Sequence, residues 1–321
     1  MAVYTEVPDD ELNAFIDTYD IGKVTSCKGI AEGVENTNYL LKTDQNDFIL
    51  TLYEKRVNRK DLPFFINLME HLAANNIACP TPVKDRQGKV LRELAGRPCA
   101  LISFLQGMWV RRPLPNHCAE LGKAMAGLHL AAQNFEGYRK NSLSVRDWRP
   151  LFEQSKAQAD SVQIGLTREI EEELDRLEAD WPTGLPQGII HADMFPNNVF
   201  FIGEHLSGII DYYFACSDAL VYDIAICLNA WCFEHDGAFN TTKARAMLSA
   251  YQAVRPLSKD EFDALPLMAR GASLRFLLTR LYDWLNIPDG AMVKPHDPLE
   301  YLRKLRFHKH IITASEYGLD L

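Results

Sequence analysis

Residues 188–213, GIIHADMFPNNVFFIGEHLSGIIDYY, hold polar side chains whose types and spacing suit a chemical reaction. An apolar run leads to His191 and Asp193, Asn198 follows five residues after Asp193, and Asp211 ends another apolar run thirteen residues later. Phosphoryl transfer uses this set of groups. One carboxylate orients and deprotonates the attacking hydroxyl, while an amide oxygen and a second carboxylate hold the Mg²⁺ that bridges the phosphates. We therefore predict that Asp193, Asn198 and Asp211 form a phosphotransfer centre.

Short strands with a loop between them are the elements expected to position these side chains. The apolar residues before His191 and those from Val199 onward are strand-like, and the last apolar run ends at Asp211. Neighbouring strand ends bring polar groups within a few ångströms of one another without a spanning structure. His191 is better explained as a buried histidine that holds the loop than as a general base.

The same residues resemble a known family. HADMFPNN followed by IIDY is similar to the catalytic loop and metal-binding segment of the aminoglycoside phosphotransferase and choline kinase group, which is related to the protein kinases. The resemblance implies ATP and Mg²⁺ as cofactors, Asp193 as the catalytic base, and Asn198 and Asp211 as Mg²⁺ ligands. It also implies that Asp223, in VYDIAI, supports the catalytic loop through hydrogen bonds.

The resemblance extends over nearly the whole chain. The segments EGVENTNYLLKT, FILTLYE and CPTPVKDRQGKVLRELAGRPCALISFLQG look like the N-terminal lobe of the bacterial homoserine kinases within this group. SDALVYDIAICLNAWCFE and LRFLLTRLYDW continue the similarity into the C-terminal lobe. The resemblance implies transfer of the ATP γ-phosphate to the side-chain hydroxyl of L-homoserine, a step toward threonine. Composition and spacing alone do not select that substrate.

The order of elements predicts a two-lobed α+β fold of the protein-kinase type. Residues 1–104, the expected nucleotide-binding lobe, combine strand-like runs with helical spacing over 62–75, which favours a small antiparallel sheet with a packed helix. Residues 105–321, the expected catalytic and substrate-binding lobe, are mainly helical with short strands near their centre. The boundary is expected within 103–107, as a short strand-to-loop crossing.

The loop between the first two strands of the N-terminal lobe is expected to cover the ATP phosphates. Gly29 and Gly33 lie in or beside this loop, and glycines let backbone amides approach anionic oxygens. Asn36 and Asn38 follow and are placed to donate hydrogen bonds to the nucleotide.

The remaining ATP contacts depart in part from the protein-kinase pattern. A phosphate-anchoring lysine is expected in the middle of FILTLYE, but Thr51 stands there, and Glu70 comes late in its helix for the usual ion pair. Lys42, on the preceding strand, is the predicted replacement, unless Mg²⁺ and backbone amides suffice. Adenine is expected beside Ser103 and Leu105, where the backbone offers a donor and an acceptor between apolar walls.

An amino-acid acceptor needs a cation for its carboxylate and an acid for its ammonium group, held in a partly dry pocket. Arg275, Arg280 and Asp283 lie on one predicted helix and supply both types. Surface salt bridges along that helix are the alternative explanation for all three residues.

The overall composition excludes several classes of partner. The chain has 321 residues, 47% of them hydrophobic, and a formal net charge of −9. Because an acidic surface repels phosphate backbones and anionic lipids, neither nucleic acid nor a membrane is an expected partner. Seven cysteines without CxxC spacing and an N-terminus, MAVYTEVPDDEL, without signal-peptide features favour the cytoplasm. The oligomeric state is not indicated.

Two alternatives to the homoserine assignment remain open at this point. The same chemistry on another alcohol, such as choline, an aminoglycoside, methylthioribose or a fructosamine, would need the same three catalytic side chains. A non-catalytic nucleotide-binding protein of the same fold is the other alternative, and the threonine at position 51 is the reason to consider it. Asp193, Asn198 and Asp211 argue against it, because a binding module does not require all three.

Overall fold

The computed structural model describes residues 5–30, 36–54, 58–287 and 295–319, and the chain divides into two compact units. The N-terminal unit contains Met1–Gly107, Asn134–Arg139 and Ser207–Tyr213. The C-terminal unit contains Met108–Gln133, Lys140–Leu206 and Phe214–Leu321. Relative to the boundary predicted at 104/105, the N-terminal unit therefore also takes 105–107 and two later segments of the chain.

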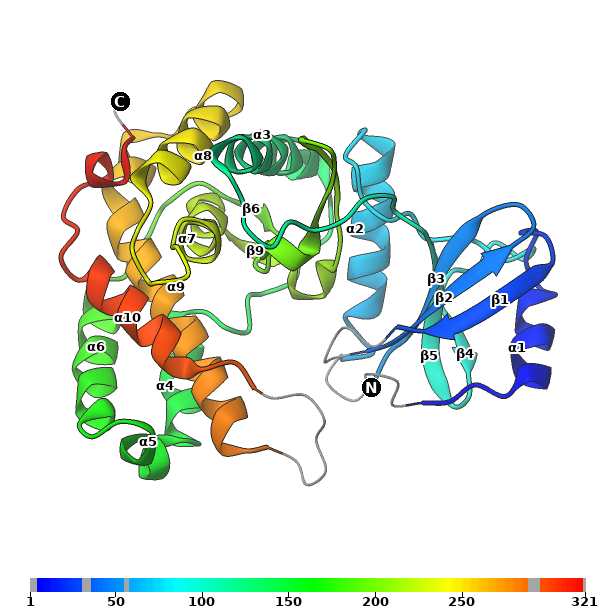
Figure 1. Cartoon of the computed structure of the whole chain (residues 1–321), viewed down its shortest axis with the longest axis horizontal. Helices are drawn as coiled ribbons and strands as arrows, with labels where there is room; N and C mark the ends of the chain where they lie inside the picture. Colours follow the sequence, from blue (N-terminus) through cyan, green and yellow to red (C-terminus); the bar gives the residue numbers. More distant parts are fainter. Residues whose placement is uncertain (1–4, 31–35, 55–57, 288–294, 320–321) are drawn as a thin grey trace. The chain divides into compact units, whose positions relative to one another are not determined.

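An antiparallel five-stranded sheet is the main element of the N-terminal unit (Figure 1). The strands lie in the order β1-β2-β3-β5-β4, and α1 packs beside β4. Leu41, Leu50 and Leu101, from three neighbouring strands, are fully buried in one cluster with Phe15 of α1. The elements of this unit are β1 (Val24–Gly29), β2 (Thr37–Thr43), β3 (Asp47–Leu52), β4 (Arg92–Leu94), β5 (Arg97–Ser103), α1 (Asp9–Ile16) and α2 (Leu62–Ala74).

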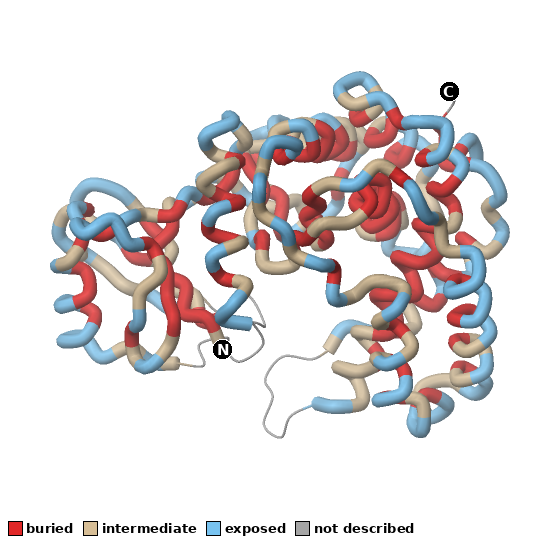
Figure 2. Tube along the Cα trace, turned by 180° about the vertical axis from the view of Figure 1, so that it is seen from behind, coloured by how far each residue is buried: buried red, intermediate tan, exposed pale blue. Residues whose placement is uncertain are grey.

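The C-terminal unit is mainly helical. Its helices are α3 (Pro115–Ala131), α4 (Val145–Glu153), α5 (Lys156–Val162), α6 (Leu166–Asp180), α7 (Leu220–Trp231), α8 (Thr241–Val254), α9 (Lys259–Leu285) and α10 (Pro298–His308). In α7 every residue except Ala230 is buried. Figure 2 shows buried residues running through the middle of this unit, while its outer helices alternate between buried and exposed residues.

Short strands interrupt the helices of the C-terminal unit, as the sequence predicts. Strand β6 (Gln187–Ile190) pairs antiparallel with β9 (Cys216–Ala219), and β7 (Val199–Ile202) pairs with β8 (His205–Ile209). The chain passes into the N-terminal unit at Ser207, within β8, and returns after Tyr213. Residues 188–213, the predicted catalytic segment, therefore contribute to both units.

Helices α3 and α8 pack at close range because α3 carries a glycine at the contact. A Cβ atom at Gly122 would overlap the backbone carbonyl oxygen of Met247 in α8. The start of the long helix α9 is fixed by a capping box, in which Ser258 Oγ accepts from the Glu261 amide at 3.2 Å and Glu261 Oε2 accepts from the Ser258 amide at 3.0 Å.

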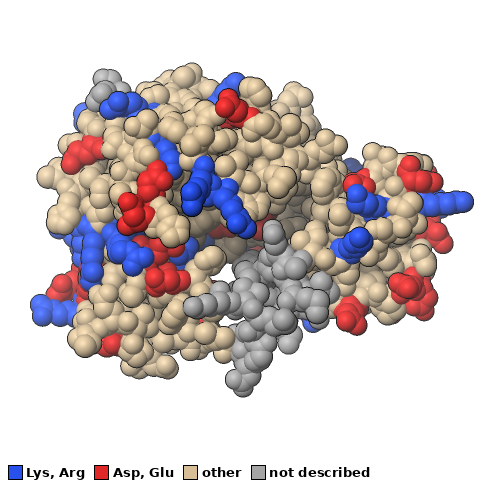
Figure 3. Space-filling view, in the orientation of Figure 1, with Lys and Arg blue, Asp and Glu red and all other residues tan. Residues whose placement is uncertain are grey.

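The charged surface carries both signs side by side. On the face drawn in Figure 3, Lys and Arg side chains lie among Asp and Glu side chains. One ion pair of the C-terminal unit joins Arg306 to Glu169 at 2.6 Å. None of the helices in the described ranges is both long enough and apolar enough to cross a membrane.

Candidate active site

The loop after β6 brings Asp193 and Asn198 together. β6 ends at Ile190, and a short 3-10 turn, Pro196–Asn198, leads into β7. The Asn198 side-chain amide donates to the Asp193 backbone oxygen at 2.8 Å and to Asp193 Oδ2 at 3.0 Å. Asp193 is half-buried and Asn198 is buried. Asn198 Oδ1 accepts no hydrogen bond from the part of the chain that the structure describes, which leaves that oxygen available to a cation.

Asp223, in the first turn of α7, holds the backbone at the start of this loop. Its Oδ2 accepts from the His191 amide at 2.8 Å, and its Oδ1 accepts from the Ala192 amide at 2.7 Å. Ala192 has a φ of 62°, a left-handed conformation that disfavours an L-residue and persists only where neighbouring groups hold it. The two hydrogen bonds that Asp223 accepts provide that restraint.

Two residues that the sequence analysis did not single out complete this support. His129 Nε2 lies 3.1 Å from Asp223 Oδ2, and His129 Nδ1 lies 2.8 Å from the Tyr251 hydroxyl. The side chains of His129 and Asp223 are fully buried. The sequence signal for His129 is weak: a single polar residue in the otherwise apolar run GLHLA of α3.

The His191 side chain lies inside the fold and contacts the loop. It is fully buried, and its Nδ1 accepts from the Asp193 amide at 3.3 Å. An Nδ1 that accepts places the ring proton on Nε2 and makes the imidazole a structural acceptor. Trp231 of α7 adds a further restraint, since its Nε1 donates to the Met194 backbone oxygen at 2.7 Å.

Asp211 lies in the N-terminal unit, two residues after the end of β8. It is exposed, and its φ of 64° is again left-handed. Desolvation by the surrounding protein raises the pKa of the Asp211 carboxyl to about 6, and a hydrogen bond from the backbone of Tyr213 opposes this rise. The Tyr213 hydroxyl lies 3.2 Å from that of Tyr53. An exposed carboxylate without a cationic partner among these neighbours suits a bound cation.

The position of the expected strand lysine is occupied by a buried hydroxyl. Thr51 is 1% exposed and pairs with Asn38 in the register of β2 and β3. Its Oγ1 donates to Asn38 Oδ1 at 2.8 Å, which orients the Asn38 amide group. Asn36 is also buried, and its Oδ1 accepts from the Glu54 amide at 3.4 Å. Gly29 ends β1 opposite Tyr39, whereas Gly33 lies outside the described residues.

Lys42 is not brought to Asn38. It lies near the turn of the β2–β3 hairpin, with its Nζ 3.3 Å from Asp47 Oδ2. Four residues separate Lys42 from Asn38 along β2, which corresponds to roughly 13 Å in an extended strand. The described part of the strand therefore gives no support to Lys42 as the replacement cation.

Ser103 and Leu105, which are predicted to contact adenine, differ in whether their backbone groups are already hydrogen-bonded. The Ser103 amide donates to the Thr81 carbonyl at 2.8 Å, so it is already used. The amide and carbonyl of Leu105, in contrast, form no hydrogen bond with any described residue. The Leu105 side chain packs against Gly208, where an added Cβ would overlap it.

The three acceptor candidates on α9 have different surroundings. Arg280 forms a 2.6 Å ion pair with Glu300, while Arg275 is buried with its guanidinium 3.8 Å from the centroid of the Phe276 ring. Asp283 is half-buried near the end of the helix. The three residues thus differ in burial and in surroundings, and their shared role in binding the acceptor stays a prediction.

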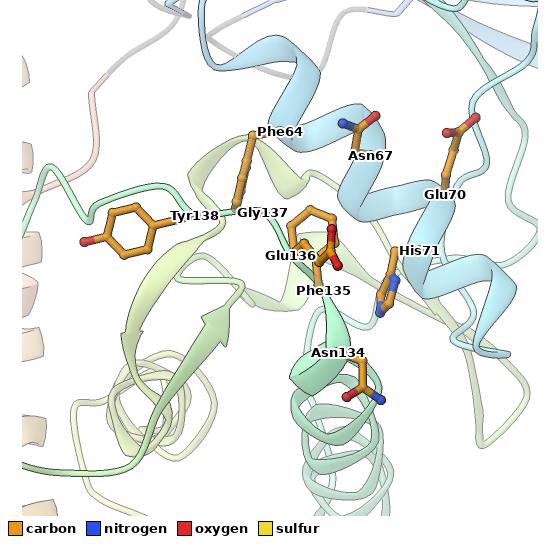
Figure 4. A pocket seen from close by; sticks show the side chains of 9 residues that line it. All are labelled: Phe64, Asn67, Glu70, His71, Asn134, Phe135, Glu136, Gly137 and Tyr138. Carbon is orange, nitrogen blue, oxygen red and sulfur yellow. The ribbon is translucent and has the colours of Figure 1, made fainter.

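An open groove of about 660 Å³ lies within the N-terminal unit. Figure 4 shows that its lining comes from α2 and from residues 134–138. The rings of Phe64 and His71 contact Phe135, and Glu70 is paired with Lys84 at 3.0 Å. None of the predicted site residues lines this groove.

Comparison with known proteins gives a family and a fold. Residues 26–257 match the family model described as the phosphotransferase enzyme family. The chain is 64% identical to the homoserine kinase of Paramagnetospirillum magneticum, with 100% of both chains covered, and 63% identical to that of Xanthobacter autotrophicus, with 99% of both covered.

Solved structures of low sequence identity share the fold. A microcompartment-associated aminopropanol kinase has a TM-score of 0.70 at 16% identity, covering 98% of this chain and 99% of that one. A choline kinase from Cryptosporidium parvum has a TM-score of 0.67 at 15% identity, covering 94% of both chains. These likenesses confirm the predicted two-lobed α+β kinase fold.

Proposed function

Because this chain belongs to the phosphotransferase enzyme family, we propose that it transfers the γ-phosphate of ATP to the side-chain hydroxyl of L-homoserine. The observation that carries the proposal is the full-length identity of more than 60% to curated homoserine kinases. The solved kinases that act on other alcohols share only the fold with this chain. The product, O-phospho-L-homoserine, is an intermediate of threonine biosynthesis, and we expect the enzyme to act in the cytoplasm.

Asp193 is the proposed catalytic base. Its Oδ2 accepts from Asn198 at 3.0 Å, so the carboxylate has a fixed orientation within the loop. The homoserine hydroxyl oxygen attacks the γ-phosphorus, the bond from that phosphorus to the β–γ bridging oxygen breaks, and the hydroxyl proton passes to the Asp193 carboxylate. ADP leaves with the electron pair of the broken bond. Alignment of the hydroxyl supplies most of the rate enhancement.

Mg²⁺ is the proposed metal, and it would neutralise charge on the phosphates. Asn198 offers an amide oxygen and Asp211 a carboxylate, and both donor types fit this ion. No group of three or more His, Cys, Asp and Glu side chains is arranged to hold a metal within the described ranges. Mg²⁺ usually takes one or two protein oxygens together with phosphate and water oxygens, which agrees with so small a ligand set.

ATP is proposed to use backbone and amide groups of the N-terminal unit. The unpaired Leu105 amide and carbonyl suit the edge of adenine, and the Asn38 amide, oriented by Thr51, suits a phosphate oxygen. Ser103, Asn36, Gly29, Gly33 and Lys42 stay predictions from the sequence. Thr51 occupies the strand position where a phosphate-anchoring lysine is expected, so the proposed mechanism uses no such lysine. The residues of the catalytic loop are unaffected by this difference.

The test is ADP release by the purified protein with Mg·ATP and each of four alcohols: L-homoserine, choline, methylthioribose and kanamycin. We expect rapid release with L-homoserine alone. Rapid release with another alcohol would keep the phosphotransfer chemistry and overturn the acceptor. ATP binding without turnover of any alcohol would favour the non-catalytic alternative.

A further inference from the structure

Arg275, in the middle of α9, is a buried cation with no counter-ion among the residues that the structure describes. The residue is 4% exposed, and its Nη1 has no hydrogen-bond partner within the described ranges. Among the described residues its guanidinium forms no ion pair, and it lies over two aromatic rings, Phe276 at 3.8 Å and Phe214 at 5.6 Å from the ring centroids. A buried charge that is neither paired nor hydrogen-bonded destabilises a protein strongly. A bound anion would supply the partner that Nη1 lacks among the described residues.

Other unsatisfied polar atoms lie in the electrostatic range of Arg275. The hydroxyls of Tyr222 and Tyr301 are buried without a hydrogen-bond partner within the described residues. Burial raises the pKa of both hydroxyls. Positive charge acts in the opposite direction, from Arg275 on Tyr222 and from Arg280 and then Arg275 on Tyr301. Buried polar groups are normally satisfied, so three unsatisfied groups within electrostatic range point to a polar ligand.

The same group of residues adjoins the catalytic loop. Phe195, two residues after Asp193, packs edge-on against Phe276 with ring centroids 4.9 Å apart. The charges of Asp193 and Arg275 both act on the pKa of the Tyr301 hydroxyl. Phe195, Phe276 and Arg275 are therefore in consecutive contact, which links the guanidinium to a residue of the loop that carries Asp193.

Arg280 does not share this property. It is five residues further along α9, which turns its side chain about 140° around the helix axis. Its Nη1 donates to Glu300 at 2.6 Å, and Glu300 also accepts from Lys304 at 2.6 Å. Although burial opposes ionisation, Lys304 and Arg280 together lower the pKa of Glu300 to about 2. Arg280 therefore already has a carboxylate partner.

We propose that Arg275 binds the α-carboxylate of the acceptor, with the Tyr222 and Tyr301 hydroxyls as additional hydrogen-bond donors. This assignment rests on the proposed function, because only an amino-acid acceptor brings a carboxylate. It makes Arg275 a specificity residue: the guanidinium distinguishes an amino acid from an amino alcohol of the same length. A guanidinium matches a carboxylate in a two-pronged geometry, which gives orientation as well as affinity.

The test compares two acceptors that differ only in the carboxylate, L-homoserine and 3-aminopropan-1-ol. In Arg275→Met, we expect the KM for L-homoserine to rise about 100-fold, because a site built for a polar group loses most of its discrimination when that contact is removed. The KM values for 3-aminopropan-1-ol and for ATP should stay within about threefold of wild type, since neither molecule contacts Arg275 in this assignment. Arg280→Met is the matched control and should keep the preference for L-homoserine.

A second measurement separates binding from folding. Without ligand, Arg275→Met should melt at or above the wild-type temperature, because the change removes an uncompensated buried charge. L-Homoserine should raise the melting temperature of the wild type and not that of Arg275→Met. A variant that loses activity equally with both acceptors, or loses affinity for ATP, would overturn the assignment.

The two proposals fail in different ways. If the wild type does not phosphorylate L-homoserine, the proposed function is wrong, and this assignment falls with it. If the wild type prefers L-homoserine and Arg275→Met keeps that preference, only the role of Arg275 is wrong.

Discussion

The loop that carries Asp193 and the segment that carries Asp211 contain the same chemical group in opposite settings. In the C-terminal unit, the backbone before Asp193 is held by a fully buried Asp223, and the Asp193 carboxylate accepts from Asn198. In the N-terminal unit, the residue Asp211 is exposed, and desolvation raises the pKa of its carboxyl to about 6. The first setting suits the proposed base, which it orients before the substrates bind, and the second suits a carboxylate that a proposed metal ion would stabilise.

Removing the fixed carboxylate should have the largest effect. Asp193→Asn keeps the shape of the loop but cannot accept a proton, so we expect kcat to fall about 1000-fold or more. ATP affinity, measured by equilibrium titration, should change less than about threefold, because the proposed mechanism places Asp193 at the acceptor and not at the nucleotide. A variant that keeps more than about a tenth of the wild-type kcat would show that Asp193 is not the base.

Replacing the Asp211 carboxylate should weaken the binding of Mg²⁺. Asp211→Asn should weaken the apparent Mg²⁺ affinity about 100-fold in turnover assays, because an amide is a poorer ligand for this ion than a carboxylate.

Without metal the same change should slightly raise the melting temperature at pH 7.5. The carboxyl has its pKa raised by desolvation, so its ionised form disfavours folding above pH 6. Because the residue is exposed, we expect this gain to stay below about 1 kcal/mol. A lower melting temperature would contradict this explanation.

The pKa of Asp211 also predicts a pH dependence. Protons compete with Mg²⁺ for its carboxylate, so the apparent Mg²⁺ affinity should fall about tenfold per pH unit below a pH of about 6 and be flat above it. Measurements of turnover against Mg²⁺ concentration between pH 5 and 8 test this expectation. In Asp211→Asn the slope below pH 6 should disappear.

Loosening the support of the catalytic loop should have a smaller effect on rate and a clear one on stability. Asp223→Ala leaves the buried amides of His191 and Ala192 without their acceptor, and we expect it to lower the free energy of unfolding by about 3 kcal/mol. Turnover should fall about tenfold as the loop loses its fixed geometry. Urea denaturation and steady-state kinetics measure the two effects. Asp236→Ala is the matched control, because Asp236 also accepts from a backbone amide but lies on the surface.

The smallest effect is expected in the N-terminal sheet. Thr51→Val removes the donor to Asn38 and should destabilise the protein by about 1 kcal/mol. If Asn38 binds a phosphate oxygen, the KM for ATP should rise a few-fold, because its amide is no longer oriented. An unchanged KM for ATP would show that Asn38 does not bind the nucleotide.

Contacts close in sequence were predictable, and contacts between distant segments were not. The pairing of Asp193 with Asn198 lies within one loop, so its spacing alone indicates it. The contact of His129 with Asp223 joins helices that are 94 residues apart in the chain, and no local pattern marks it. Nor could periodicity separate Arg275 from Arg280, because the difference depends on Glu300 of another helix.

Lys42 illustrates the same limit within one hairpin. The sequence places it on the strand that carries Asn38, and this adjacency suggested a shared site. The pairing register, however, puts Lys42 opposite Asp47, so the local ion pair determines where its ammonium group lies.

The close approach of α3 and α8 at Gly122 links helix spacing to the catalytic loop. The same two helices carry His129 and Tyr251, whose 2.8 Å hydrogen bond continues the support of Asp223. A side chain at position 122 would push the two helices apart. It would thereby lengthen the hydrogen bond between His129 and Tyr251 that supports Asp223. Position 122, which has no functional group, is therefore where random mutagenesis should yield folded but slow enzymes.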